Sequence, residues 1–278
     1  MRPPRRTRPD AAANPAPQGL TDTDAIPVES GYAVPALDKG LDILEALADQ
    51  ADGFSLTELA LRLERNRSEI FRMVDCLKRR GYIRTHPATD KMTLSLRLFE
   101  LAHKTPVTRR LTAEAMPLMK TLAREVGQSC HLAVCNGTEM LVVAMTNSDR
   151  PMEFSVREGT RVGLLTSSSG RIFLAFQPQP ERLRLLGQLP PVTPAKARAL
   201  AVQLDELARA GFESAPSDFI RGVTNMSCPI RDIHGHALAS LTVPHLEWQG
   251  GQAVAPISKS LKALVGAAQD ISARVLAG

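Results

Sequence analysis

The sequence predicts an α+β protein with two folded domains, an N-terminal domain of three helices and a hairpin and a C-terminal domain with a largely antiparallel sheet. The chain has 278 residues, of which 44% are hydrophobic, and this length and content suit about two hydrophobic cores. Helical periodicity with two capping boxes marks the first domain. Strand-like segments joined by hairpin turns and mixed with helices mark the second, which is typical of an α+β architecture.

Composition excludes several classes of protein. No run approaches the roughly 18 apolar residues that a membrane-spanning helix needs, and no apolar region follows Arg5-Arg6 as in a secretion signal, so we expect a cytoplasmic protein without a membrane partner. The four cysteines form no C-x-x-C pair, which argues against a disulfide framework and a structural zinc site. They are Cys76, Cys130, Cys135 and Cys228.

The N-terminal part divides into a tail and a small domain. Residues 1–33 hold six prolines and few large apolar side chains, so they cannot offset the entropy of ordering, and we expect a disordered tail. Residues 34–94 form the first domain. Its first helix carries leucines at helical spacing, namely Leu37, Leu41, Leu44 and Leu47.

Two short helices follow the first one at close spacing. The pattern from Ser55 to Glu58 is a capping box that begins the second helix, and the pattern from Asn66 to Glu69 begins the third. The third helix should end before Gly81. Such spacing is typical of a helix-turn-helix, and the period-two segments 82–86 and 91–94 add a hairpin, so residues 34–94 read as a winged helix-turn-helix.

Positive charge is concentrated in this region. Residues 60–110 hold thirteen basic and five acidic side chains, a net charge of +8, while the whole chain carries +5. This distribution is expected of a surface that binds phosphates, although a solvated arginine-rich helix face would look the same. Aromatic residues make up only 4%, which counts against stacking on single strands and favours double-stranded DNA.

The third helix of a winged helix-turn-helix lies in the major groove with its N-terminal residues at base edges. Arginine can contact guanine there, and serine can contact phosphate or base. Glu69 either accepts from cytosine or only closes its capping box, and the hairpin cations either touch the DNA backbone or are merely solvated. The candidate DNA-binding residues are Arg65, Arg67, Ser68, Glu69 and Arg72 on the helix, and Arg84 and Lys91 on the hairpin.

The remainder divides into linker helices at 95–126 and a second domain at 127–278. Strands are expected at 131–135, 140–144, 152–156, 223–231 and 237–244, with helices after residue 170, at 180–187, at 194–210 and from 257 to 275. Ser167, Ser168, Ser169 and Gly170 precede an apolar helix, so hydroxyl and free N–H groups converge where an anion is favoured. The alternative is that the serines only cap their helix.

Catalytic signals are weak, and the chain is not expected to be an enzyme. The serine run lacks the G-x-S-x-G elbow, and no phosphate-binding glycine loop or H-E-x-x-H motif occurs. Asp232, His234 and His236 read as the polar turn of a hairpin. A metal at His131, Cys135 and Cys228 is the alternative to their being ordinary core residues; it would make the protein an enzyme or metal-dependent sensor with a DNA-binding appendage. No cofactor is indicated.

The order of the motifs resembles the IclR family of transcriptional regulators over residues 34–276. The matching segments of the first domain are Leu37–Leu41, Leu56–Ala60, Arg67–Arg72 and Leu77–Ile83; those of the second are His131–Val134, Leu165–Arg171, Gly222-Val223 and Ser227–Ile230. Glu69 stands where the family often carries Thr, and Ser168-Ser169 where Ala-Leu or Gly-Ala is commoner.

The resemblance implies a regulator that binds a palindromic operator and senses a small organic (carboxylic) acid through a GAF-like effector-binding domain. It also implies a homodimer through the first domain, and often a dimer of dimers through the second. By the same resemblance, the effector site would combine the serine run Ser167, Ser168, Ser169 and Gly170 with His131, Phe154, Cys228 and Thr242, and with Asp218 at the entrance.

Overall fold

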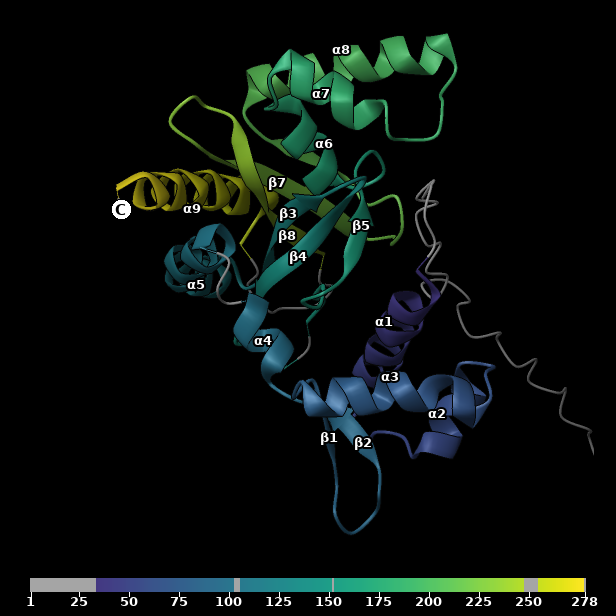
Figure 1. Ribbon diagram of the computed structural model, residues 1–278. Helices are drawn as coiled ribbons and strands as arrows, with labels where there is room; N and C mark the ends of the chain where they lie inside the picture. The colour runs from purple at the N-terminus through teal and green to yellow at the C-terminus, as the bar shows by residue number, and fades with distance from the viewer. Residues whose placement is uncertain (1–33, 103–105, 152, 248–254, 278) are drawn as a thin grey trace, which may run out of the picture. The chain divides into compact units, whose positions relative to one another are not determined.

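The computed structural model describes residues 34–102, 106–151, 153–247 and 255–277, and the chain divides after Leu98 into two compact units (Figure 1). Within these described residues, no helix is long and apolar enough to cross a membrane. The tail predicted at 1–33 lies outside them.

The N-terminal unit is a three-helix core with a two-stranded hairpin, as predicted. Its elements are α1 Pro35–Ala48, α2 Leu56–Arg62, α3 Arg67–Arg79, β1 Ile83–Thr85 and β2 Met92–Leu94. One side chain from each helix, Ile43, Leu59 and Ile70, is fully buried in the common core. Met92 joins them from the hairpin, because β2 also pairs with Phe54 just before α2.

Both predicted capping boxes are present. The Ser55 hydroxyl accepts from the Glu58 N–H at 3.3 Å, while the Glu58 carboxylate accepts from the Ser55 N–H at 2.7 Å. Asn66 and Glu69 make the same reciprocal pair at the start of α3. Since each box satisfies N–H groups that a helix start leaves free, the two boxes fix where α2 and α3 begin and hold the turn between them short.

The C-terminal unit is one antiparallel sheet of six strands in the order β5-β4-β3-β8-β7-β6. Its strands are β3 Cys130–Asn136, β4 Glu139–Thr146, β5 Arg161–Gly163, β6 Glu213–Pro216, β7 Val223–Arg231 and β8 Ala237–Leu246. Its helices are α5 Pro106–Val126, α6 Ser168–Ala175, α7 Gln179–Leu186, α8 Pro194–Ala210 and α9 Ile257–Ala277. A short helix, α4 Arg97–Ala102, crosses the division between the units.

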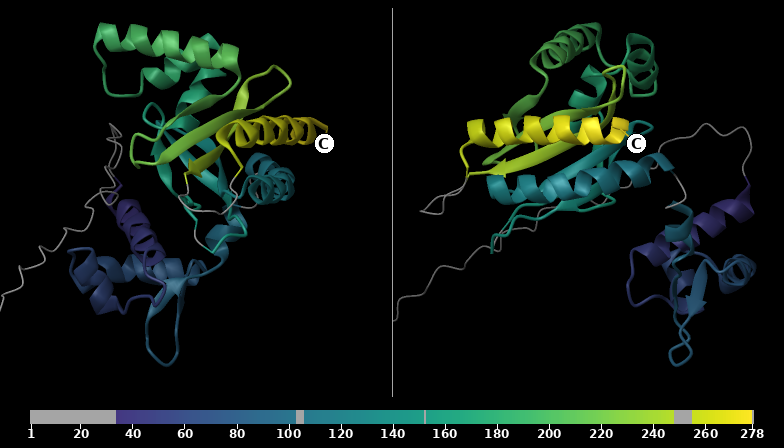
Figure 2. Two further views of the ribbon diagram at one scale, coloured as in Figure 1. Left: turned by 180° about the vertical axis from the view of Figure 1, so that it is seen from behind. Right: turned by 90° about the vertical axis from the view of Figure 1, so that its left-hand side faces the viewer.

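Helices cover both faces of this sheet. α5 and α9 pack against each other and against one face, while α6 lies on the other with α7 and α8 beyond it (Figure 2). The two layers therefore enclose two separate hydrophobic clusters. Leu241 of β8 belongs to the cluster under α5 and α9, and Leu174 of α6 to the other.

Two predictions about the second unit are corrected by the structure. Part of the predicted linker at 95–126 is core, because Leu111, Ala115 and Met119 of α5 are buried against α9 and the sheet. The linker assignment failed because an amphipathic helix shows an apolar stripe whichever unit it packs on.

The strand predicted at 152–156 does not form over the described residues 153–156. Side chains of the following segment take backbone donors at the end of β4 and just after it: the Glu158 carboxylate accepts from the Met145 N–H at 3.2 Å and the Glu153 carboxylate from the Ser148 N–H at 3.0 Å. The strand that pairs with the outer side of β4 is β5, and the edge strand β6 on the other side of the sheet was not predicted at all. β6 consists of Glu, Ser, Ala and Pro, which are residues with low strand propensity.

Candidate nucleic-acid interface and buried polar cluster

The start of α3 exposes the side chains expected of a recognition helix. Arg67, Ser68 and Arg72 are all exposed, and Ser68 and Arg72 lie one helical turn apart on the same face. The Ser68 hydroxyl donates to the Asn66 side-chain oxygen at 2.9 Å. Arg67 is the first residue of α3, beside the positive end of the helix dipole, and Arg72 lies in the second turn; exposed cations next to a helix start favour phosphate.

Other predicted DNA-binding residues have partners within the protein. Arg65 donates to Asp42 of α1 at 3.1 Å. The Glu69 carboxylate accepts from the Asn66 N–H at 3.2 Å, which supports the capping role over base contact. Lys91 is half-buried with its ammonium 3.9 Å from the Glu58 carboxylate, whereas Arg84 is exposed on β1. The α3 surface (Arg67, Ser68 and Arg72) and Arg84 are therefore the most available cations and donors of the predicted set.

In the C-terminal unit, the strand register aligns polar side chains across four strands. His131 of β3 pairs with Thr242 of β8, Thr242 pairs with Ser227 of β7, and Ser227 pairs with Glu213 of β6. Directly opposed residues of antiparallel strands point to the same face of the sheet. All four are buried, so this polar row lies entirely inside the unit.

α6 lies directly on the polar row. The Ser169 and Thr242 hydroxyl oxygens are 2.8 Å apart, and those of Thr242 and Ser227 are 2.7 Å apart, which makes a continuous chain of hydroxyls from helix to sheet. The Ser240 hydroxyl donates to the Ser169 carbonyl at 2.7 Å. A Cβ at Gly170 would stand 2.2 Å from the carbonyl oxygen of Leu164 in the turn between β5 and α6, so only glycine lets the helix start pack on this turn.

An ion pair closes one end of the row. The Arg171 guanidinium of α6 donates to the Glu213 carboxylate at 2.7 Å, and a second nitrogen reaches Asp218 at 3.4 Å. The side chains of Arg171 and Glu213 are 11% and 5% exposed, while that of Asp218 is 62% exposed. Asp218 therefore stands at the solvent end of the cluster.

Three buried polar atoms of this cluster have no hydrogen-bond partner in the protein. They are the Ser168 hydroxyl, the Nδ1 atom of His131 and one Glu213 oxygen. Buried polar groups are normally satisfied, and each unsatisfied one costs about 1–3 kcal/mol. Ser168 begins α6, while His131 and Glu213 belong to the row beneath this helix, and a polar ligand bound there can supply the missing bonds.

Sequence reasoning found part of this cluster. It named His131, Ser168, Ser169 and Thr242, which the structure brings together, and Ser167, whose hydroxyl caps α6 by accepting from the Gly170 N–H at 3.1 Å. It missed Arg171, Glu213, Ser227 and Ser240. Alternation along β7 and β8 could have found the two serines, since both have the phase of Thr242.

Cys228 was predicted to line this site, and the structure contradicts that prediction. Cys228 pairs with Leu241 and is buried in the cluster under α5 and α9, on the opposite face of the sheet. A shift of one residue along a strand changes the face, so Ser227 takes the position assigned to its neighbour. Phe154 is half-buried in the irregular segment after β4, and its carbonyl accepts from the Ser129 hydroxyl.

The metal alternative also fails on geometry. His131 and Cys228 lie on opposite faces of the sheet, and no group of three potential metal ligands meets among the described residues. Asp232 forms the expected polar turn, where its carboxylate accepts from the His234 and His236 N–H groups at 2.8 Å each.

A winged helix-turn-helix with an exposed basic recognition helix, followed by a separate sheet unit with a buried polar cluster, defines a two-domain DNA-binding regulator. Comparison with known families agrees. Residues 36–87 match the IclR helix-turn-helix domain, and residues 103–273 match the family described as bacterial transcriptional regulator IclR C-terminal. The chain belongs to the IclR family of bacterial transcriptional regulators.

Individual relatives and solved structures agree with this assignment. The HTH-type transcriptional regulator BhcR of Paracoccus denitrificans is 26% identical over 253 residues, which are 88% of either chain. An IclR homolog from Microbacterium hydrocarbonoxydans, solved in complex with 4-hydroxybenzoate, has a TM-score of 0.71 at 26% identity and covers 87% of this chain and 100% of its own. HmgR of Pseudomonas aeruginosa has a TM-score of 0.67 at 26% identity, with coverages of 87% and 99%.

The buried histidine gives the cluster a predicted pH dependence. Burial lowers the pKa of His131 from 6.5 to about 4, because the charged imidazolium loses its hydration. Below pH 6.5 the unfolded chain takes up a proton at His131 that the folded chain does not. The contribution of neutral His131 to the free energy of unfolding is therefore fully present above pH 6.5 and is lost as pH falls toward 4. In His131→Gln, the slope of unfolding free energy against pH should decrease in this window by up to about 1.4 kcal/mol per pH unit.

Urea denaturation at a series of pH values measures this slope. His234→Gln, which removes an exposed histidine of the hairpin turn, is the matched control and should keep the wild-type slope. An unchanged slope in His131→Gln would show that His131 is not held neutral by burial.

Proposed function

We propose that the chain is a ligand-responsive transcriptional regulator that binds a palindromic operator as a homodimer and senses a small carboxylic acid at the buried polar cluster. The observation that carries the proposal is the hydroxyl chain of Ser169, Thr242 and Ser227 beside three unsatisfied polar atoms under α6. The acid must bind the DNA-competent and DNA-incompetent states unequally, since otherwise it changes nothing. A regulator of chromosomal genes works in the cytoplasm, and we place the protein there.

The α3 surface supports the DNA-binding half. Arg67 at the start of α3 and Arg72 in its second turn carry charge on the exposed surface that would face a major groove, and Arg84 on β1 is placed to touch the backbone. Arg65 and Glu69 have partners inside the protein, which supports a role for them in positioning α3. We therefore expect direct DNA contact mainly from Arg67, Ser68 and Arg72.

Replacing Arg72 tests this interface. Arg72→Ala should weaken operator binding by roughly 1–3 kcal/mol if the side chain contacts a base, or reduce the salt slope by about one unit if it contacts phosphate. Arg198→Ala on the exposed face of α8 removes the same charge elsewhere and should change neither the operator affinity nor the salt slope. Fluorescence anisotropy over a range of salt concentrations measures both quantities, and wild-type values for a folded Arg72→Ala would rule out the contact.

The polar cluster supports the acid-binding half. Hydroxyls of Ser168 and Ser169 and the free N–H groups of α6 favour a carboxylate at the helix start. Glu213 does not oppose this, because Arg171 neutralises it at 2.7 Å. The 26% identical homolog solved with 4-hydroxybenzoate supports an organic acid as the ligand class.

Removing one hydroxyl from the centre of the cluster tests the acid site. A thermal-shift screen of small carboxylates that includes 4-hydroxybenzoate should find a stabilising acid, and a hundredfold excess over its dissociation constant raises stability by about 2.7 kcal/mol. Thr242→Val keeps the side-chain shape but breaks the chain between Ser169 and Ser227, so it should reduce that shift by more than half.

Thr224→Val is the control, because Thr224 lies three residues from Ser227 on β7 and therefore belongs to the opposite face of the sheet. It should keep the full shift. An undiminished shift in Thr242→Val, or in the bulkier Ser169→Leu, would place the acid elsewhere.

Exposed leucines on α1 support a dimer. Leu37 and Leu41 are 59% and 47% exposed and lie one turn apart, outside the buried face formed by Ile43 and Leu47. α4 has no buried residue, and Leu98 and Leu101 on it are also partly exposed. Two-fold binding to half-sites needs at least a dimer, and these helices are the surfaces we assign to it.

Charges on α1 should separate the subunits. Leu37→Lys with Leu41→Lys should give a monomer by light scattering at micromolar concentration and lose operator affinity, because lysines in an apolar interface remain unpaired. Leu61→Lys on α2, where the leucine is 81% exposed, is the control. A double variant that stays dimeric, or a wild-type monomer with full operator affinity, would contradict the proposed contact.

A further inference from the structure

The central strands of the C-terminal unit separate at one end. β3 and β8 pair only from His131–Thr242 to Ala133–Ser240, although β3 continues to Asn136 and β8 begins at Ala237. The first residue of β8 bonds the two residues that follow α6 instead: its N–H donates to the Phe176 carbonyl at 3.1 Å, and its carbonyl accepts from the Gln177 side chain at 2.8 Å. The diverging ends therefore leave a space that no strand fills.

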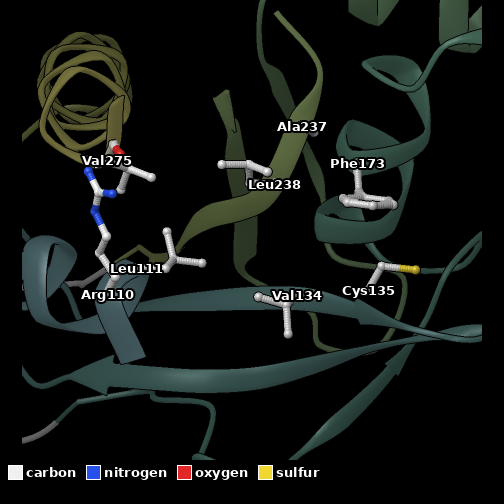
Figure 3. A pocket seen from close by; sticks show the side chains of 8 residues that line it. All are labelled: Arg110, Leu111, Val134, Cys135, Phe173, Ala237, Leu238 and Val275. Carbon is white, nitrogen blue, oxygen red and sulfur yellow. Dashed lines mark hydrogen bonds between the residues drawn. The ribbon is translucent and has the colours of Figure 1, made fainter. Parts of the chain in front are cut away.

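A cavity of about 430 Å³ occupies this end of the sheet (Figure 3). It is lined by Arg110, Leu111, Val134, Cys135, Phe173, Ala237, Leu238 and Val275. Figure 3 shows Arg110 and Val275 at one end and Phe173 and Cys135 at the other, with Val134 and Leu238 between them. Its size lies within the range of small-molecule sites.

The lining is apolar except at its ends. Arg110 carries the charge among the lining residues, and its guanidinium donates to the Val275 carbonyl near the end of α9 at 2.5 Å. A guanidinium has five N–H donors, so this bond leaves others for an anion. At the opposite end, burial raises the pKa of the Cys135 thiol, and the nearby Glu181 carboxylate raises it further. The thiol is therefore neutral at pH 7.

This cavity is separate from the polar cluster. None of its lining residues belongs to the row of His131, Thr242, Ser227 and Glu213. Leu111 belongs to the hydrophobic cluster under α5 and α9, and Phe173 to the cluster under α6. An occupant would therefore touch both helical layers of the unit at once.

We propose that this cavity is a second ligand site, for an amphipathic monocarboxylate whose carboxylate pairs with Arg110 and whose hydrocarbon body fills the apolar space toward Phe173. Arg110 places a positive charge at one end of the cavity, which selects an anion over a neutral or cationic molecule of equal size. The apolar walls select a hydrocarbon body over a small polar acid. The proposal stands independently of the acid site under α6.

The wild-type chain allows a test that needs no variant. Octanoate should protect Cys135 from alkylation by iodoacetamide at pH 9, where a fraction of the thiol is ionised, measured peptide by peptide by mass spectrometry. Cys76, which is also half-buried but lies in the N-terminal unit, is the internal control and should react at an unchanged rate. Octylamine and 1-octanol, of the same chain length, should protect Cys135 at least tenfold less well.

Variants then separate the two sites. By calorimetry, Arg110→Gln should weaken octanoate binding about tenfold or more, Leu238→Trp should fill the cavity and abolish it, and Arg198→Gln should leave it unchanged. Thr242→Val should keep octanoate binding, so a failure of the acid site under α6 does not imply failure here. The proposal is overturned if octanoate does not protect Cys135, if octylamine protects it equally, or if a folded Arg110→Gln binds octanoate as the wild type does.

Discussion

The close approach of α6 to the sheet is the contact on which the C-terminal unit depends. It brings the Ser169 hydroxyl to 2.8 Å from that of Thr242 and the Ser169 carbonyl to 2.7 Å from the Ser240 hydroxyl. Glycine at 170 lets the start of α6 pack on the Leu164 carbonyl in the turn that precedes the helix. A larger side chain at 169 would hold the helix away from the strands. The hydroxyl chain would then face solvent, and the buried polar cluster would not exist.

The same strands serve two purposes because their side chains alternate. β7 and β8 present hydroxyls toward α6, while Met226 and Leu241 on their other face join the apolar core under α5 and α9. A ligand under α6 is thus separated from α5 by a single sheet. In densely packed interiors small displacements pass to neighbouring layers, which offers a physical route for coupling within this unit.

Sequence patterns predicted the N-terminal unit well, because its signals are local. The capping boxes at Ser55 and Asn66 and the period-two hairpin are each complete within a few residues. The C-terminal unit depends on contacts between distant segments. The ion pair of Arg171 with Glu213 joins residues 42 positions apart, and nothing in the sequence near either residue announces it. The site also depends on which residues of a strand face α6. The family resemblance named Cys228, but its neighbour Ser227 holds the position opposite Thr242.

The most direct test of the account is a crystal structure of the full chain with the stabilising acid bound. The account predicts the acid on the α6 face of the sheet, with its carboxylate within hydrogen-bond distance of the hydroxyls of Ser168, Ser169 or Thr242. An acid bound on the α5 and α9 face, with the hydroxyl chain of Ser169, Thr242 and Ser227 intact and unoccupied, would contradict it.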